Sequence, residues 1–129
     1  MIYSNSLIYI HIHESEVPWL KIFTHEPRKE FSDCSREERM MIFDVLDLIE
    51  REMLTYYKPE KINIASFGNM LPRVHWHIMA RFVNDSYFPE PMWGAKQREG
   101  DVKVAPMEPF IENLKAVLAS RLVLATEAT

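Results

Sequence analysis

Two histidines separated by one residue, His75 and His77, are the residues of this sequence whose type and spacing best suit chemistry. Residues two apart in a strand project to the same side, so both imidazoles would reach one site. One imidazole would act as a nucleophile and the other as a donor to a leaving oxygen. The same spacing also suits a pair of metal ligands or two histidines on a solvated sheet face, and the pair alone leaves these interpretations open.

A turn, Gly68-Asn69, precedes the histidine pair by a few residues. Backbone N–H groups of such turns form concavities that bind anions, and the Asn69 side chain suits phosphate oxygens in the same way. Asparagine is also typical of turns with a positive φ, which need no ligand. By itself the turn is explained without a ligand, but its position in front of the two histidines adds to the case for a functional site there.

The strands that must position these residues are predicted from patterns with a period of two. Around the histidine pair, Val74, Trp76 and Ile78 form one apolar face, and we expect Trp76 to lie in the core. His75 and His77 fall on the opposite face. The predicted strands comprise residues 7–13, 20–24, 61–67 and 73–82.

A capping box predicts the start of a long helix. Ser35 and Glu38 have the spacing at which a hydroxyl and a carboxylate each accept a bond from a backbone N–H group. Apolar residues then recur at helical spacing as far as Tyr56, and Pro59 ends the helix. A second helix is predicted over residues 108–125.

The order of these elements is strand, strand, helix, strand, strand, helix, and short connections favour antiparallel neighbours. The predicted fold class is therefore α+β, a mostly antiparallel sheet with one long helix packed on it and a C-terminal helix. Residues 25–34 and 84–100 are polar or rich in proline and are predicted loops. No repeat or linker divides the sequence, so we expect a single domain over residues 1–129.

The chain is acidic, with a formal net charge of -4. This charge gives no general attraction to nucleic acid or to an anionic membrane, although a local site can still bind one nucleotide. The apolar runs are too short for a membrane span, and the N-terminus lacks the pattern of a signal peptide. Cys34 is the only cysteine, which excludes an internal disulfide. We expect a cytoplasmic protein that binds neither nucleic acid nor membrane.

The stretch of residues 61–81 reads KINIASFGNMLPRVHWHIMAR and resembles the signature of the histidine triad (HIT) superfamily, in which histidines alternate with apolar residues. It is most similar to a bacterial branch that resembles diadenosine tetraphosphate hydrolase-like HIT proteins. The pattern of that branch continues with an aspartate, a proline-rich turn and a Trp-Gly pair. The matching residues here are Asp85, Pro89, Pro91, Trp93 and Gly94. The resemblance covers residues 5–100, including the order of the strands and the long helix.

The resemblance implies a HIT-like fold and a nucleotide substrate. His75 would attack the α-phosphorus to form a nucleotidylated histidine, which water would hydrolyse, and His77 would contact the phosphate and the leaving oxygen. Asn63 and Asn69 match positions that bind phosphate or ribose in relatives. His13 lies near the position where relatives use an acidic or amide side chain on the ribose. Members of the family usually form homodimers and need no cofactor.

The first triad position departs from the family pattern. Arg73 stands where most of the superfamily has histidine and the similar branch has glutamine. In the family, the backbone carbonyl at this position orients the nucleophilic imidazole, and any residue provides a carbonyl. The arginine would pair with phosphate oxygens, or it would fill the pocket with a fixed charge and lower the activity.

The sequence therefore predicts a HIT-type nucleotide hydrolase or nucleotidyl transferase. Its substrate would be a dinucleoside polyphosphate, a nucleoside phosphoramidate or an aminoacyl adenylate. One alternative is a non-catalytic nucleotide-binding module, in which Arg73 has ended catalysis. A second is a metal-binding protein, which requires that the strand with His11 and His13 adjoins the strand with His75 and His77. The last alternative is a structural domain with histidines on a solvated sheet face.

Overall fold

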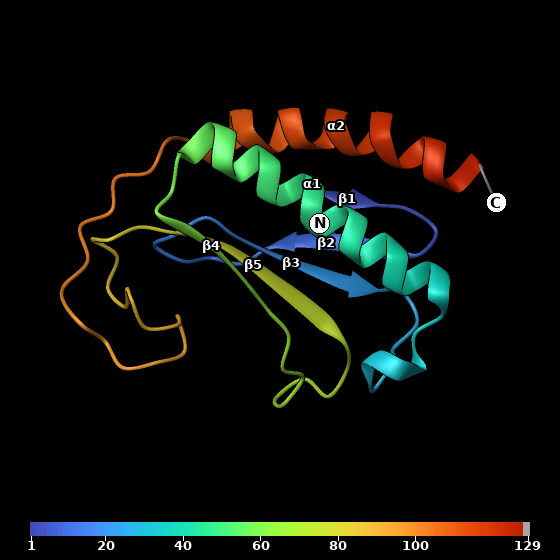
Figure 1. Cartoon of the computed structure of the whole chain (residues 1–129), viewed down its shortest axis with the longest axis horizontal. Helices are drawn as coiled ribbons and strands as arrows, with labels where there is room; N and C mark the ends of the chain where they lie inside the picture. Colours follow the sequence, from blue (N-terminus) through green and yellow to red (C-terminus); the bar gives the residue numbers. More distant parts are fainter. Residues whose placement is uncertain (128–129) are drawn as a thin grey trace.

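The structure, a computed structural model, describes residues 1–127, with side chains as far as residue 122 (Figure 1). The last two residues of the predicted domain, 128 and 129, lie outside the described residues. In chain order the elements are β1 (Tyr3–Ser4), β2 (Ile8–Ile12), β3 (Trp19–Thr24), the 3-10 helix η1 (Phe31–Asp33), α1 (Arg36–Tyr57), β4 (Lys61–Ala65), β5 (His75–Arg81) and α2 (Met107–Glu127).

The five strands form one sheet in the order β1-β2-β3-β5-β4, and every neighbouring pair is antiparallel. The last two strands are therefore placed in reverse order, so that β5, and not β4, pairs with β3. This arrangement puts the strand with the histidine pair between β3 and β4. The predicted α+β fold with an antiparallel sheet and two helices is confirmed.

The predicted strands correspond to β2, β3, β4 and β5, with ends that differ by one or two residues, as is common at element boundaries. Two elements are absent from the prediction. Strand β1 has two residues and η1, inside the predicted loop 25–34, has three. Segments this short carry no periodic pattern, because a pattern needs several residues on one face.

The predicted capping box at the start of α1 is present. Ser35 Oγ accepts from the Glu38 N–H at 3.1 Å, and Glu38 Oε1 accepts from the Ser35 N–H at 2.6 Å. Glu38 is almost fully buried and also accepts from Nε of Arg28 at 3.0 Å, which compensates its charge. The helix ends at Tyr57, and the following residue, Lys58, adopts the left-handed conformation in front of Pro59.

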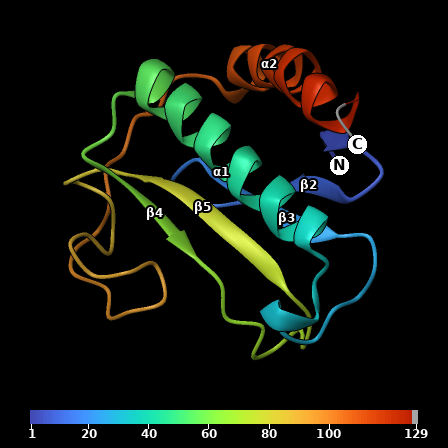
Figure 2. The ribbon, with the colours of Figure 1, turned by 45° about the vertical axis from the view of Figure 1, so that its right-hand side comes forward.

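Both helices cover the same face of the sheet, as Figures 1 and 2 show from two directions. The main hydrophobic core lies between this face and the helices. Its fully buried members include Ile10, Ile22 and Ile78 from three neighbouring strands. From the helices, they include Ile49 of α1 and Leu114 of α2. No helix of the described residues 1–127 covers the opposite face of the sheet, and the two histidines project from it.

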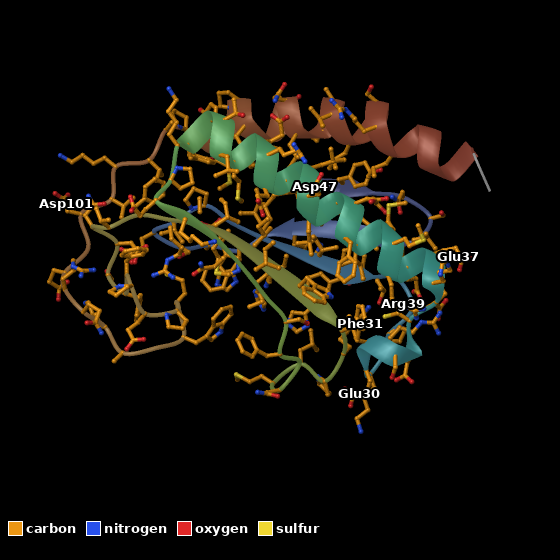
Figure 3. All side chains as sticks on the ribbon, viewed as in Figure 1. Glu30, Phe31, Glu37, Arg39, Asp47 and Asp101 are labelled. Atoms are coloured by element: carbon orange, nitrogen blue, oxygen red, sulfur yellow. The ribbon has the colours of Figure 1, made fainter. Side chains whose placement is uncertain are left out.

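A long loop connects β5 with α2 on the side of the molecule away from η1. Figure 3 labels Asp101 in this loop and Phe31 in η1. Phe31 packs near Trp76, with ring centroids 6.0 Å apart, and Trp76 also packs against the core. Trp76 thus points away from the histidines, as predicted.

Candidate active site

The side chains of β3 and β5 meet in rows on the uncovered face of the sheet. Phe23 pairs with His75, and Lys21 pairs with His77. Because directly paired residues of antiparallel strands project to the same side, these four side chains share one face. The imidazole centroids of His75 and His77 are 5.1 Å apart. The predicted convergence of the two histidines is therefore present in the fold.

The orientation of His75 is set by a backbone carbonyl. Its Nδ1 lies 2.9 Å from the carbonyl oxygen of Arg73. A carbonyl only accepts hydrogen bonds, so Nδ1 must carry the proton, and in the neutral ring Nε2 then holds a free lone pair. The Phe23 ring stacks on the imidazole at a centroid distance of 5.3 Å and an interplanar angle of 16°. Hydrogen bond and stacking together fix the ring with Nε2 as its available nucleophilic atom.

The orientation of His77 is set by an indole. The Nε1–H group of Trp19 donates to Nδ1 of His77 at 3.0 Å. Indole only donates, so Nδ1 of His77 is unprotonated, and in the neutral ring the proton sits on Nε2. The two histidines are therefore held as opposite tautomers. His75 offers a lone pair at Nε2, and His77 offers an N–H donor at Nε2.

The electrostatics of the site keep His77 neutral. Burial is the largest cause of its lowered pKa, and His75, Lys21 and His13 lower it further, to about 4. Only 7% of the residue is exposed. At neutral pH the His77 ring therefore carries no charge and retains the single N–H defined by Trp19.

A pocket opens over the two histidines. Its volume of about 440 Å³ is within the usual range for small-molecule sites. Its polar side chains are those of Lys21, Asn69, His75 and His77. The remaining lining is mainly apolar and includes Phe23, Phe67, Met70, Leu71 and Trp93. A cavity with an apolar wall and a few convergent polar groups is typical of a site for a ligand with an aromatic part and a polar part.

The turn in front of β5 borders this pocket. Gly68 has a φ of 67°, a conformation that side chains with a Cβ rarely adopt. A Cβ there would also lie 3.3 Å from the Arg73 carbonyl oxygen, the atom that orients His75. Ser66 supports the same region, because its hydroxyl donates to the carbonyl oxygen of His75 at 2.6 Å. Asn69, the next residue after the glycine, is exposed and lines the pocket, and its predicted contact with phosphate or ribose stays a prediction.

Comparisons with known proteins identify the family and the fold of the chain. A family model described as HIT domain matches residues 1–84, which is most of the chain. The chain belongs to the HIT family. Proteins with this fold generally bind nucleotides, and the family includes hydrolases and transferases.

Solved structures of other HIT proteins extend the likeness over nearly the whole chain. A histidine triad protein of Bradyrhizobium japonicum is 26% identical, with a TM-score of 0.73 over 89% of this chain and 87% of that chain. A HIT protein of Sinorhizobium meliloti 1021 is 23% identical, with a TM-score of 0.69 over 92% and 86%. The second likeness supports the fold alone. No curated protein matches the chain.

In this HIT protein the first triad residue, Arg73, contacts His75 through its backbone carbonyl. Its guanidinium donates to the carbonyl oxygen of Thr24 and lies 5.8 Å from the centroid of the Phe23 ring. The side chain borders a neighbouring pocket of about 330 Å³ and is absent from the lining of the pocket over the histidines. The backbone carbonyl is thus where the family resemblance places it, and the predicted binding of phosphate by the side chain stays a prediction.

Two other predicted binding residues lie beyond the pocket lining. Asn63 of β4 accepts from Nη1 of Arg81 at 2.7 Å and so supports a buried arginine. His13 lies just after β2, with its ring 4.1 Å from the ring of Trp19. It borders a different pocket of about 450 Å³, formed with the start of α2. Both residues thus contact other side chains of the protein, and their predicted contacts with a substrate stay predictions.

A buried ion pair between Arg81 and Asp85 lies at the start of the loop that carries Trp93. Arg81 Nε lies 2.9 Å from one carboxylate oxygen of Asp85, and Arg81 also donates to the Glu90 carbonyl at 2.7 Å. Burial alone would raise the pKa of Asp85, but bonds from Arg81 and three backbone N–H groups lower it to about 2. The loop brings the Trp93 ring to 4.9 Å from His77 and 4.7 Å from Phe67.

The sequence prediction did not include Trp19 and Lys21 in the site. Both belong to β3, whose start was predicted at Leu20, one residue too late. The alternation of Trp19, Lys21 and Phe23 would have placed all three on one face. The proximity of that face to His75 and His77 depends on the pairing of β3 with β5, which the sequence pattern does not contain.

The metal-binding alternative requires adjacent β2 and β5. Strand β3 lies between them, so the pair His11 and His13 is separated from the pair His75 and His77. Within residues 1–127, no group of three or more His, Cys, Asp or Glu side chains could hold a metal ion. In the same part of the chain, no helix is long and apolar enough to cross a membrane.

Proposed function

We propose that this HIT protein is a nucleotide hydrolase or nucleotidyl transferase in which His75 forms a covalent bond to phosphorus. The observation that carries the proposal is the hydrogen bond from Nδ1 of His75 to the Arg73 carbonyl oxygen. It leaves Nε2 as the nucleophilic atom in a pocket that His77 also lines. Such positioning of a nucleophile by a fixed partner is the usual basis of covalent catalysis.

In the first step, the lone pair of Nε2 attacks the α-phosphorus and forms an N–P bond. The bond from phosphorus to the leaving group breaks, and its electron pair goes to the leaving atom. The imidazole becomes positively charged, and its Nδ1–H group stays bonded to the Arg73 carbonyl, which stabilises that charge. The N–H group at Nε2 of His77 donates to an oxygen on the phosphoryl or leaving group.

In the second step, water attacks the same phosphorus and the N–P bond breaks. The electron pair returns to Nε2 of His75, the nucleotide is released as a monophosphate, and the extra proton of the water passes to solvent. His75 is then again the neutral Nδ1–H tautomer. The chain's own residues thus complete the cycle, and neither step includes a metal ion or an organic cofactor.

The substrate classes are those of the resemblance, a dinucleoside polyphosphate or a nucleoside phosphoramidate. The proposed role of Asn69 is to contact the phosphate or ribose, and its position in the lining of the pocket supports this role. The aromatic side chains of Phe67 and Trp93 are 55% and 47% exposed, so each retains surface against which a nucleobase can pack. The proposal also includes contacts with the substrate by Arg73, Asn63 and His13.

A homodimer is the proposed assembly. Strand β4 ends the sheet, and no described residue pairs with its outer edge. Ile64 on this strand and Phe43 on α1 are 41% and 51% exposed, so each leaves apolar surface that a second copy of the chain could cover. Light scattering during gel filtration tests the assembly, and a monomeric mass at micromolar concentration would contradict it.

The experiment for the proposed function measures AMP release from diadenosine tetraphosphate and from adenosine 5′-phosphoramidate, with and without a chelator. We expect release that tolerates the chelator and disappears in His75→Ala. His25→Ala is the matched control, because His25 is exposed and outside the pocket, and it should retain the activity. AMP binding without turnover by the wild type would instead favour the non-catalytic nucleotide-binding module.

A further inference from the structure

Lys21 occupies the middle of a row that crosses three strands. It pairs with His77 on β5 and with His11 on β2, on the face that carries the pocket. The pKa values of His11, His13 and His77 are all lowered, and burial is the largest cause for each of them. The positive charge of Lys21 lowers each pKa further. The strand register thus places Lys21 directly between His11 and His77.

The ammonium of Lys21 is a cation without a carboxylate partner. None of the ion pairs among residues 1–122 includes it, although the side chain is half-buried. Its Nζ lies 5.9 Å from the centroid of the Phe23 ring. Of the described residues that line the pocket, Lys21 is the only one of the Lys, Arg, Asp and Glu types. A partly desolvated positive charge in a pocket without acidic groups attracts an anionic ligand.

The fixed tautomer of His77 restricts which leaving groups the site can stabilise. Because Nδ1 of His77 accepts from Trp19, His77 holds one proton, on Nε2. It can stabilise a leaving oxygen through a hydrogen bond, but transfer of that proton would leave an imidazolate anion. An oligophosphate departs as an anion and needs no proton, whereas an amine leaving group does. The site is therefore better matched to a phosphate leaving group.

We propose that Lys21 binds the phosphate chain beyond the reacting phosphorus, along the row from His77 towards His11, and so selects substrates whose leaving group is an oligophosphate. This inference rests on the proposed function for its catalytic part. When His75 attacks, the bond from the α-phosphorus to the bridging oxygen breaks, and its electron pair stays on the oligophosphate. Lys21 stabilises the negative charge that develops on that leaving group.

The test compares wild type with Lys21→Met, which removes the charge at similar length, and with Lys21→Arg, which retains a charge. Lys115→Met is the matched control, because Lys115 is exposed on α2 and lies outside the pocket. The first readout is calorimetric binding of inorganic tripolyphosphate, which requires no catalysis. The second is the ratio of kcat/KM for diadenosine tetraphosphate to kcat/KM for adenosine 5′-phosphoramidate.

We expect Lys21→Met to weaken tripolyphosphate binding and to lower the kcat/KM ratio, each by about tenfold or more, as is typical for loss of a charged hydrogen bond. Lys21→Arg should retain most of both, and Lys115→Met should match wild type. Unchanged tripolyphosphate binding in Lys21→Met, or no binding by wild type, would overturn the role of Lys21. Absence of AMP release from both substrates would overturn the proposed function, while the binding comparison would still decide the role of Lys21.

Discussion

The indole N–H of Trp19 donates to Nδ1 of His77 across 3.0 Å, from one strand to its neighbour. This bond makes His77 the tautomeric opposite of His75, whose Nδ1 donates to the carbonyl of Arg73. The pair thus presents a lone pair and a donor to one pocket. Two strands and one turn set this difference, and no acidic side chain takes part.

Replacement of Trp19 by phenylalanine removes the donor and retains most of the ring. We expect His77 to lose its preference for the Nε2–H tautomer and kcat to fall about fivefold to tenfold, with a smaller change in KM. Long-range proton–nitrogen NMR correlations of the histidine rings report the tautomer directly. The matched control is Trp76→Phe, because the buried Nε1 of Trp76 has no hydrogen-bond partner. An unchanged His77 tautomer in Trp19→Phe would refute the positioning role.

The lowered pKa of His77 links stability to pH. In the unfolded chain His77 titrates near 6.5, whereas in the fold it titrates near 4. The unfolded state therefore binds the proton first as the pH falls, and stability present above pH 6.5 is lost towards pH 4. Relative to His77→Gln, wild type should lose about 3 kcal/mol over this window. Urea unfolding at several pH values gives the free energy of unfolding of wild type and of His77→Gln as a function of pH. The same pH dependence in both proteins would contradict the expectation.

Gly68→Ala tests the turn that supports the nucleophile. The substitution places a Cβ at a φ of 67° and 3.3 Å from the Arg73 carbonyl oxygen. We expect a loss of about 1 to 2 kcal/mol in the free energy of unfolding and a lower kcat, because the carbonyl that orients His75 must shift. Urea unfolding and AMP release measure the two effects. A variant with wild-type stability and kcat would show that the turn adapts without disturbing His75.

Asp85→Asn tests the loop that holds Trp93 against the site. The change breaks a fully buried ion pair with Arg81 and should cost about 3 to 5 kcal/mol of stability. The exposed pair of Asp47 and Arg51 is the comparison, and Asp47→Asn should change stability little. Urea unfolding measures both variants. Equal effects of the two substitutions would mean that the buried pair is no more important than a surface pair.

Local patterns predicted much of the framework. The spacing of Ser35 and Glu38 predicted the capping box that is present, because a cap depends only on residues within one turn. The period of two predicted that His75 and His77 share a face and that Trp76 faces the core, because strand geometry alternates side chains. The HIT family membership likewise follows from a continuous stretch of sequence.

The sequence by itself determined which residues alternate along the strands and that the long helix begins after Ser35. It also determined that the Gly68-Asn69 turn lies close in the chain to the imidazoles of His75 and His77. Only the tertiary structure decided what surrounds them. Pairing of β3 with β5 brought Trp19 and Lys21 to the histidines, and packing of the loop after β5 brought Trp93 to His77 and Phe67. The physical reason is range, since alternation and capping depend on neighbours in the chain. Strand order and loop placement depend on contacts between residues far apart in sequence.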